Sequence, residues 1–160
     1  MERTHLFLSH ARPEDDAFTR WLSLQLAKHG YGVWCDLTQL LGGENFYKNI
    51  ETVIRDGSAK FLFVLTKSSN QRPGPLEELH VAKDTARNHD LEDFIIPLHL
   101  DDLPRREMNM YLSPLNSVPF DRGWAAGLKQ LLEKLEAADV PKSAGFSPDA
   151  VTSWWRSHYS

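Results

Sequence analysis

The run Lys60-Phe61-Leu62-Phe63-Val64-Leu65-Thr66 decides the fold class of this 160-residue chain. The five central residues of the run are all apolar, whereas a strand with one face in water alternates apolar and polar side chains. A short apolar run of this kind predicts a strand that is buried on both faces. Such strands are typical of parallel sheets that helices cover on both sides.

Strand and helix patterns alternate around this run. Short apolar runs predict strands at residues 5–9, 31–36, 60–66, 94–100 and 117–120. Helical spacing of apolar residues predicts helices at residues 13–29, 46–57, 75–88 and 124–135, with a loop at residues 37–43. With right-handed crossovers, the alternation predicts an α/β fold, a flavodoxin-like five-stranded parallel sheet of order 2-1-3-4-5 with helices on both faces.

The expected topology also predicts where a ligand binds. In such sheets, ligands lie beyond the carboxyl ends of the strands, at the switch point between the first and third strands. The loops at residues 9–13, 37–45 and 67–75 are therefore the expected site. Pro97 lies inside the fourth predicted strand, where it cannot donate a ladder hydrogen bond, so we expect that strand at an edge of the sheet or with a bulge.

The composition changes near residue 138, which divides the chain into a domain at 1–138 and an appendage at 139–160. The appendage begins as a Pro/Gly/Ser linker. Val151, Trp154, Trp155 and Tyr159 then form the apolar face of a short amphipathic helix. We expect this face to dock on the domain or on a neighbouring chain, and the helix to lead into further C-terminal sequence.

The charge and cysteine content exclude several classes of protein. Eighteen basic and 22 acidic residues give a net charge of −4 without a basic stripe, which argues against direct nucleic-acid binding. The single cysteine, Cys35, cannot form an intrachain disulfide and favours a reducing compartment. No apolar run approaches the ~20 residues of a membrane span, and no signal peptide is evident. The sequence therefore predicts a soluble cytoplasmic protein without membrane contact.

The motifs of other proteins with this topology are absent. A phosphoacceptor receiver requires carboxylates where this chain has Ser9-His10 and Thr66-Lys67. The chain lacks the glycine-rich loops of Rossmann and P-loop proteins and the nucleophile elbow of hydrolases. The pair Glu77 and His80 has the spacing of metal ligands, but nothing in the sequence completes such a site, so we expect no metal.

Five segments together resemble Toll/interleukin-1 receptor (TIR) domains. The resemblance extends over residues 4–137, and its segments occur in the family's order and at its usual spacing. They are Phe7-Leu8-Ser9-His10-Ala11, Gly30-Tyr31-Gly32-Val33-Trp34-Cys35-Asp36, Leu40-Leu41-Gly42-Gly43, the third strand with Ser68 and Ser69, and Glu78-Leu79-His80-Val81-Ala82. The variant is of bacterial type and is especially similar to TIR modules that accompany short prokaryotic Argonautes, which continue C-terminally.

The resemblance implies an NAD⁺ glycohydrolase, in which NAD⁺ is the substrate and no cofactor is needed. A glutamate assists cleavage of the nicotinamide–ribose bond and yields nicotinamide with linear or cyclic ADP-ribose. Family spacing identifies Glu78 as this catalytic residue. In many family members, a Trp or Cys lies a few residues before the glutamate, whereas this chain has Arg72-Pro73-Gly74-Pro75.

Helix geometry distinguishes Glu78 from its neighbour Glu77. At 100° per residue, Glu78 lies about 80° from the centre of the apolar stripe, and Glu77 lies nearly opposite it. If the helix begins at Pro75, Glu77 is its third residue and can interact with the helix dipole. We therefore expect Glu78 at the border of the cleft and Glu77 in water. The stripe consists of Leu76, Leu79, Ala82 and Ala86.

Six further residues are expected to contact the substrate, namely Ser9, His10, Arg12, Asp36, Phe46 and Ser69. Several have a second interpretation. Arg12 either binds the pyrophosphate or forms a surface salt bridge, and Asp36 either orients Ser9 or the ribose or caps a turn. Phe46 either stacks on the ligand or packs in the core beside Ile50 and Val53.

The segment Leu40, Leu41, Gly42 and Gly43 resembles the family's BB loop, and the resemblance implies that it mediates assembly with other TIR domains. The resemblance also implies a role in antiphage defence that is activated by assembly. A short Argonaute would then be a partner, bound through C-terminal sequence that this chain lacks. Two alternatives remain open: a non-catalytic TIR scaffold for protein–protein contacts, and a TIR effector that acts on host signalling.

Overall fold

The structure is a computed structural model that describes residues 3–35, 39–41 and 50–142. These residues form one sheet with the strand order β3-β2-β1-β4-β5-β6. All neighbouring strands pair in parallel except β3 and β2, which are antiparallel. The five parallel strands therefore have the predicted order 2-1-3-4-5. The strands are β1 (His5–Ser9), β2 (Gly32–Cys35), β3 (Gln39–Leu41), β4 (Ser58–Leu65), β5 (Ile95–His99) and β6 (Val118–Pro119).

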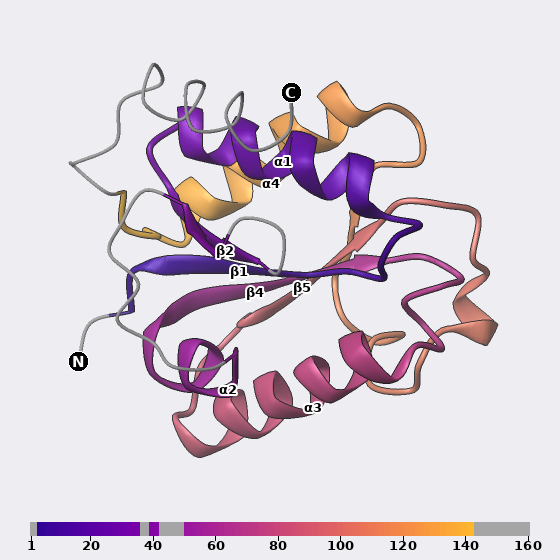
Figure 1. The fold of residues 1–160 in the computed structure, drawn as a ribbon, viewed down its shortest axis with the longest axis horizontal. Helices are drawn as coiled ribbons and strands as arrows, with labels where there is room; N and C mark the ends of the chain where they lie inside the picture. The colour runs from indigo at the N-terminus through magenta and orange to yellow at the C-terminus, as the bar shows by residue number, and fades with distance from the viewer. Residues whose placement is uncertain (1–2, 36–38, 42–49, 143–160) are drawn as a thin grey trace.

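Helices cover both faces of this sheet (Figure 1). Helices α1 (Asp16–Lys28) and α4 (Trp124–Ala137) lie on one face. The short α2 (Ile50–Thr52), the π-helical turn η1 (Val53–Gly57) and α3 (Pro73–Asn88) lie on the other, and a 3-10 turn, η2 (Arg105–Glu107), precedes β6. No helix in the described part of the chain is long and apolar enough to cross a membrane.

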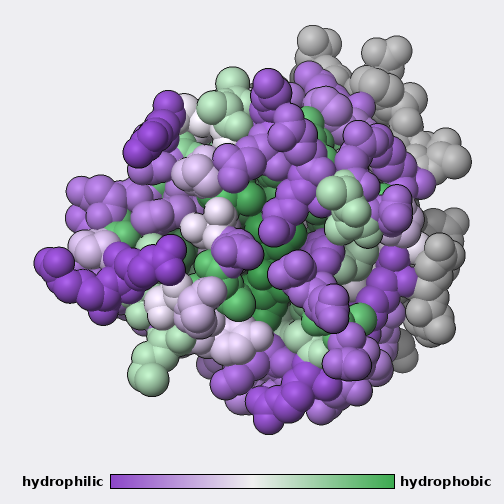
Figure 2. Space-filling view, turned by 180° about the vertical axis from the view of Figure 1, so that it is seen from behind, coloured by the Kyte–Doolittle hydropathy of each residue, from purple (hydrophilic) through white to green (hydrophobic). Residues whose placement is uncertain are grey.

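Strand β4 has the two-sided burial that its sequence predicts. Leu62 and Val64 belong to the core beneath α1 and α4, whereas Phe61, Phe63 and Leu65 belong to the core beneath α3. All five side chains are completely buried. The outer surface seen in Figure 2 is mostly hydrophilic, with its hydrophobic residues gathered toward the middle. The two cores therefore hold the central strand from both sides.

Strand β3 corrects the expected loop at residues 37–43. Leu40 and Leu41 belong to this strand, which pairs antiparallel with β2, so that Trp34 lies opposite Leu40. The backbone groups on the outer edge of β2 would otherwise lack partners, and the returning chain supplies them. Gly42 and Gly43 lie outside the described residues.

Helix α3 begins at Pro73, two residues before the expected start at Pro75. A proline in the first helical turn costs little, because the N–H groups of that turn have no helical acceptor. Glu77 is therefore the fifth residue of α3, and the first turn contains no acidic residue. The expected interaction of Glu77 with the helix start is wrong.

The expectation that Pro97 marks an edge strand is also wrong, because β5 lies between β4 and β6. However, β6 has only two residues, and it pairs with Leu98 and His99. The residue before them, Pro97, has no partner in β6. A proline is tolerated in this interior strand because the neighbouring strand is too short to reach it.

Candidate active site

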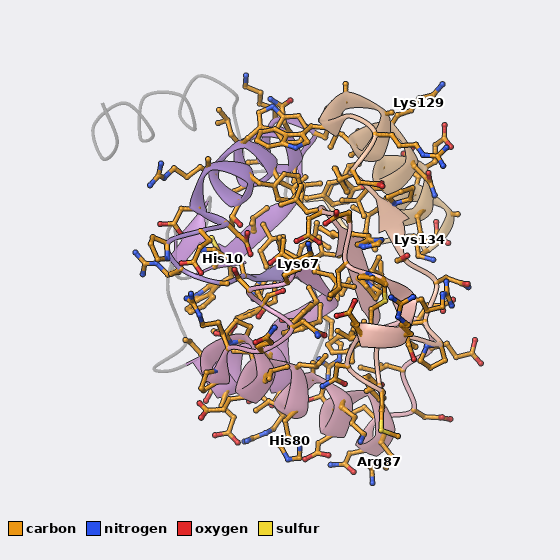
Figure 3. All side chains as sticks on the ribbon, turned by 90° about the vertical axis from the view of Figure 1, so that its right-hand side faces the viewer. His10, Lys67, His80, Arg87, Lys129 and Lys134 are labelled. Atoms are coloured by element: carbon orange, nitrogen blue, oxygen red, sulfur yellow. The ribbon has the colours of Figure 1, made fainter. Side chains whose placement is uncertain are left out.

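A cleft opens at the carboxyl end of the sheet, where the topology predicts a ligand. Figure 3 shows this end of the molecule, with His10 after β1 and Lys67 after β4. The cleft has a volume of about 240 Å³. Residues from the loop after β1 and from the first turns of α3 line it, namely His10, Arg12, Arg72, Gly74, Pro75 and Glu78.

Glu78 faces this cleft and is held by the end of β1. The Ser9 hydroxyl donates a hydrogen bond of 2.6 Å to Oε1 of Glu78. Ser9 is completely buried, Glu78 is half-buried and Glu77 is exposed. The next residue, Leu79, is buried in the core beneath α3. Helical spacing therefore predicted the placement of both glutamates correctly, although it missed the bond to Ser9.

His10 is buried at the base of the cleft. Its Nε2 lies 3.0 Å from Oδ1 of Asp16, the first residue of α1. Arg12 and Arg20 lie within 4 Å of the same carboxylate, at 3.8 and 3.9 Å. The Asp16 carboxylate therefore holds the imidazole ring and offsets part of the charge of the two arginines.

Two arginines lie at the mouth of the cleft. Arg12 has a side chain that is 54% exposed, so its guanidinium is accessible to a ligand. Arg72 donates a hydrogen bond of 2.7 Å to the Arg12 carbonyl oxygen and pairs with the Glu14 carboxylate. Arg72 therefore joins the loop after β1 to the start of α3. Sequence reasoning missed this residue, because its partners are 58 and 60 positions away.

A second contact joins the same two loops beneath the surface. The Thr66 hydroxyl donates a hydrogen bond of 2.7 Å to Oδ2 of Asp15. Burial raises the pKa of the Asp15 carboxyl, and the nearby Asp101 adds to the rise. The Thr66 hydrogen bond and the charge of His10 act against it. The loop after β1 and the loop between β4 and α3 are thus joined by two sets of contacts, those of Arg72 and the Thr66–Asp15 hydrogen bond.

The structure does not bring Ser69 into the cleft. Ser69 is completely buried, and its hydroxyl donates to the Val64 carbonyl oxygen at 2.6 Å. The Ser69 hydroxyl oxygen in turn accepts a hydrogen bond of 2.9 Å from the backbone N–H of Thr66. The Ser69 side chain therefore stabilises the turn after β4, which explains why this serine follows the strand.

Other predicted site residues lie outside the described part of the chain. These are Asp36, Phe46, Gly42 and Gly43, together with the C-terminal helix expected after residue 146. Leu40 and Leu41 are placed only as backbone of β3. Cys35 packs in the core beneath α1, and Trp34 stacks on Phe7 with ring centroids 5.1 Å apart.

Gly74 lines the cleft and has no side chain. A Cβ atom built on Gly74 would meet no heavy atom within 4 Å. The family resemblance leads one to expect a Trp or Cys in this segment, a few residues before the glutamate. Among the described residues, no three histidine, cysteine, aspartate or glutamate side chains are arranged to hold a metal ion. The cleft is lined by the Glu78 carboxylate, the His10 ring and two arginines, each of which lies beside a carboxylate.

Comparisons with known proteins identify the family. The TIR domain family model matches residues 6–132. The chain is 29% identical over 143 residues to the uncharacterized protein y4cD of Sinorhizobium fredii, and this match covers 89% of the chain. The chain spans only 22% of the length of that relative.

The fold also matches a solved structure. It superposes with a TM-score of 0.65 on a chain from the structure of the activated Roq1 resistosome directly recognizing the pathogen effector XopQ, described as its TIR domains. The match covers 82% of this chain and 99% of that one at 15% identity, which shows a shared fold. Together with the family match over residues 6–132, this places the chain in the family of TIR domains.

Proposed function

We propose that this TIR domain hydrolyses NAD⁺ to nicotinamide and ADP-ribose, with Glu78 as the catalytic residue. The observation that carries the proposal is the hydrogen-bonded carboxylate of Glu78, which lines a cleft at the carboxyl end of the sheet. Ligands of doubly wound α/β proteins bind at this end. Glu77, one residue earlier, is exposed and does not line the cleft.

The reaction requires little beyond a well-placed negative charge. The bond between C1 of the ribose and the pyridinium nitrogen breaks, and its electron pair leaves with nicotinamide, which becomes neutral. The leaving group therefore needs no proton. The ribose carbon gains oxocarbenium character, and a carboxylate beside it stabilises the transition state more than the ground state. Water then attacks this carbon and loses a proton, or an adenine nitrogen attacks it and gives the cyclic product.

An exposed arginine at the mouth of the cleft suits the other half of the substrate. The exposed guanidinium of Arg12 can pair with the pyrophosphate, as arginine does with phosphate oxygens. His10 lines the base of the cleft beside Glu78, where it can contact the ribose. The proposed roles of Asp36 and Phe46 as further substrate contacts remain predictions from the sequence.

The cleft volume favours a site that assembly completes. Pockets for drug-sized ligands enclose roughly 300–1,000 Å³. The cleft formed by the described residues has a volume of about 240 Å³, which lies below this range. We propose that contact between TIR domains through Leu40, Leu41, Gly42 and Gly43 supplies the remaining surface.

The wider role follows from the same proposal. The y4cD relative is much longer than this chain, which supports a TIR domain that acts as one module of a larger cytoplasmic protein. We propose that further C-terminal sequence connects it to a short Argonaute-type partner, and that NAD⁺ loss serves antiphage defence. Nucleic acid would then be recognised by the partner and not by this acidic domain.

The direct experiment is nicotinamide release from NAD⁺, measured by chromatography over a range of protein concentrations. The proposal predicts release that rises more steeply than in proportion to protein concentration. A chain that self-associates without any release at high concentration would instead be a non-catalytic scaffold. An effector of host signalling would bind host TIR domains without consuming NAD⁺.

A further inference from the structure

We infer that Ser9 is a positioning residue for Glu78, so that its hydroxyl determines where the catalytic carboxylate lies. This inference rests on the proposed function. The role differs from the substrate contact that the sequence suggests for Ser9. The juxtaposition joins the last residue of β1 to the sixth residue of α3, 69 positions apart in the chain.

The Ser9 donor is fixed by the centre of the sheet. Ser9 ends β1, which pairs with β2 on one side and with β4 on the other. Ser9 lies opposite Phe63 of β4, and neither residue has any exposed surface. Immediately after it, the His10 ring is held by Asp16 at 3.0 Å. The backbone that carries this donor cannot move without disrupting the strand.

The acceptor, the Glu78 side chain, has more conformational freedom than the donor. Glutamate is among the side chains with the most rotamer freedom, and Glu78 is only half-buried. Packing of Leu79 and Ala82 fixes the backbone of α3, but it does not fix a carboxylate that extends from the border of the buried stripe. The 2.6 Å bond from Ser9 Oγ to Oε1 constrains the carboxylate directly.

Ser69 provides a matched comparison within the same molecule. It is also completely buried and also follows the carboxyl end of a central strand. Its hydroxyl donates to the Val64 carbonyl oxygen and makes no contact with Glu78 among the bonds described. Ser69 therefore has a purely structural role at this end of the sheet. The Ser9 hydroxyl, in contrast, donates to the Glu78 carboxylate.

A double-mutant cycle in the full chain tests the inference. At a protein concentration where the wild type cleaves NAD⁺, Ser9→Ala is expected to lower kcat by about tenfold and to change KM by less than about twofold, because the carboxylate is misplaced and not removed. In the Glu78→Gln background, the same change is expected to alter kcat by less than about twofold. Ser69→Ala is the control, and any effect of it on kcat is expected to be equal in the wild-type and Glu78→Gln backgrounds.

A crystal structure of Ser9→Ala gives a second readout that does not depend on activity. We expect the Glu78 carboxylate to leave its position beside residue 9. The inference is overturned if the carboxylate stays in place, if Ser9→Ala leaves kcat unchanged, or if its loss is equal in both backgrounds. Those results would leave the proposed function intact. That function fails separately, if wild type releases no nicotinamide or if Glu78→Gln cleaves NAD⁺ normally.

Discussion

Glu77 and Glu78 are consecutive residues of α3, yet only Glu78 lines the cleft and accepts the Ser9 hydroxyl at 2.6 Å, while Glu77 is exposed. The difference arises from the 100° that separates neighbouring residues on a helix. Leu79 and Ala82 are buried in the core, so the helix cannot rotate to exchange the two carboxylates. The helix packing thus selects which glutamate is available for chemistry.

The Arg72 contact predicts an effect on substrate binding with little effect on stability. Arg72 and Glu14 are both more than a third exposed, and exposed ion pairs contribute about 0–1 kcal/mol to folding. Arg72→Ala should therefore lower the free energy of unfolding by at most ~1 kcal/mol. It should raise KM for NAD⁺ several-fold, since the loop that carries Arg12 loses its contact with the start of α3 and keeps the Thr66–Asp15 hydrogen bond. Urea unfolding and initial rates measure the two effects.

Arg87→Ala is the matched control for Arg72→Ala. Arg87 is an exposed arginine at the other end of α3, where it pairs with Asp84. Its loss should cost similarly little stability and leave KM unchanged. Equal KM values for Arg72→Ala and the wild type would contradict the role of the link.

The buried Asp15 predicts a stability change with a defined sign. Burial raises the pKa of Asp15 in the folded state above its usual 3.8, so the folded protein binds this proton more tightly than the unfolded chain does. Stability is therefore lost as the pH rises from the unfolded pKa through the folded one. Asp15→Asn cannot ionise, so its free energy of unfolding relative to wild type should increase between about pH 4 and pH 7. A relative stability that falls over this range would contradict the assignment.

Gly127 in α4 predicts a clash. A Cβ atom on Gly127 would lie 2.4 Å from Cδ1 of Phe120, whose ring is almost completely buried beneath the helix. Overpacking of this kind typically lowers the free energy of unfolding by about 1–3 kcal/mol. The higher helix propensity of alanine raises it by up to ~1 kcal/mol. Gly127→Ala should therefore lower the melting temperature. Gly74→Ala, whose Cβ has open space, should not, and equal melting temperatures for the two variants would contradict this packing.

Assembly predicts that specific activity depends on concentration. If contact through the segment 40–43 completes the site, dilution should lower nicotinamide release per molecule. Leu41→Arg should lower it further, while the circular dichroism spectrum stays that of a folded domain. Leu41 lies in the three-residue edge strand β3, so the change does not interrupt the parallel sheet. Specific activity that is constant on dilution would argue against assembly.

The sequence predicts the parallel sheet and the burial of Glu78 because both depend on periodicity. The run 61–65 has no polar face, and the stripe that begins at Leu76 repeats at helical spacing. Strand β3 was missed because three residues carry no periodic signal, and it forms only because the edge of β2 lies beside it. The start of α3 was misjudged because Pro73 and Pro75 are both acceptable in a first turn.

The side-chain contacts of the site were less predictable. The Ser9–Glu78 bond and the Arg72 contacts join residues 58–69 positions apart, and only the packed fold brings them together. The prediction that Ser69 contacts the substrate failed because its hydroxyl stabilises a turn with Thr66, three residues earlier. A serine after a strand is equally suited to hold a turn or a ligand.

Nicotinamide release by Glu78→Gln and by Glu77→Gln, measured side by side where the wild type is active, tests the central claim most directly. Glutamine keeps the size of the side chain and removes its charge, so Glu78→Gln should lower the rate on the order of 10² or more, as expected when a transition-state stabiliser is lost. Glu77→Gln should keep most of the activity, because that carboxylate is exposed and does not line the cleft. Normal cleavage by Glu78→Gln together with an inactive Glu77→Gln would contradict the account.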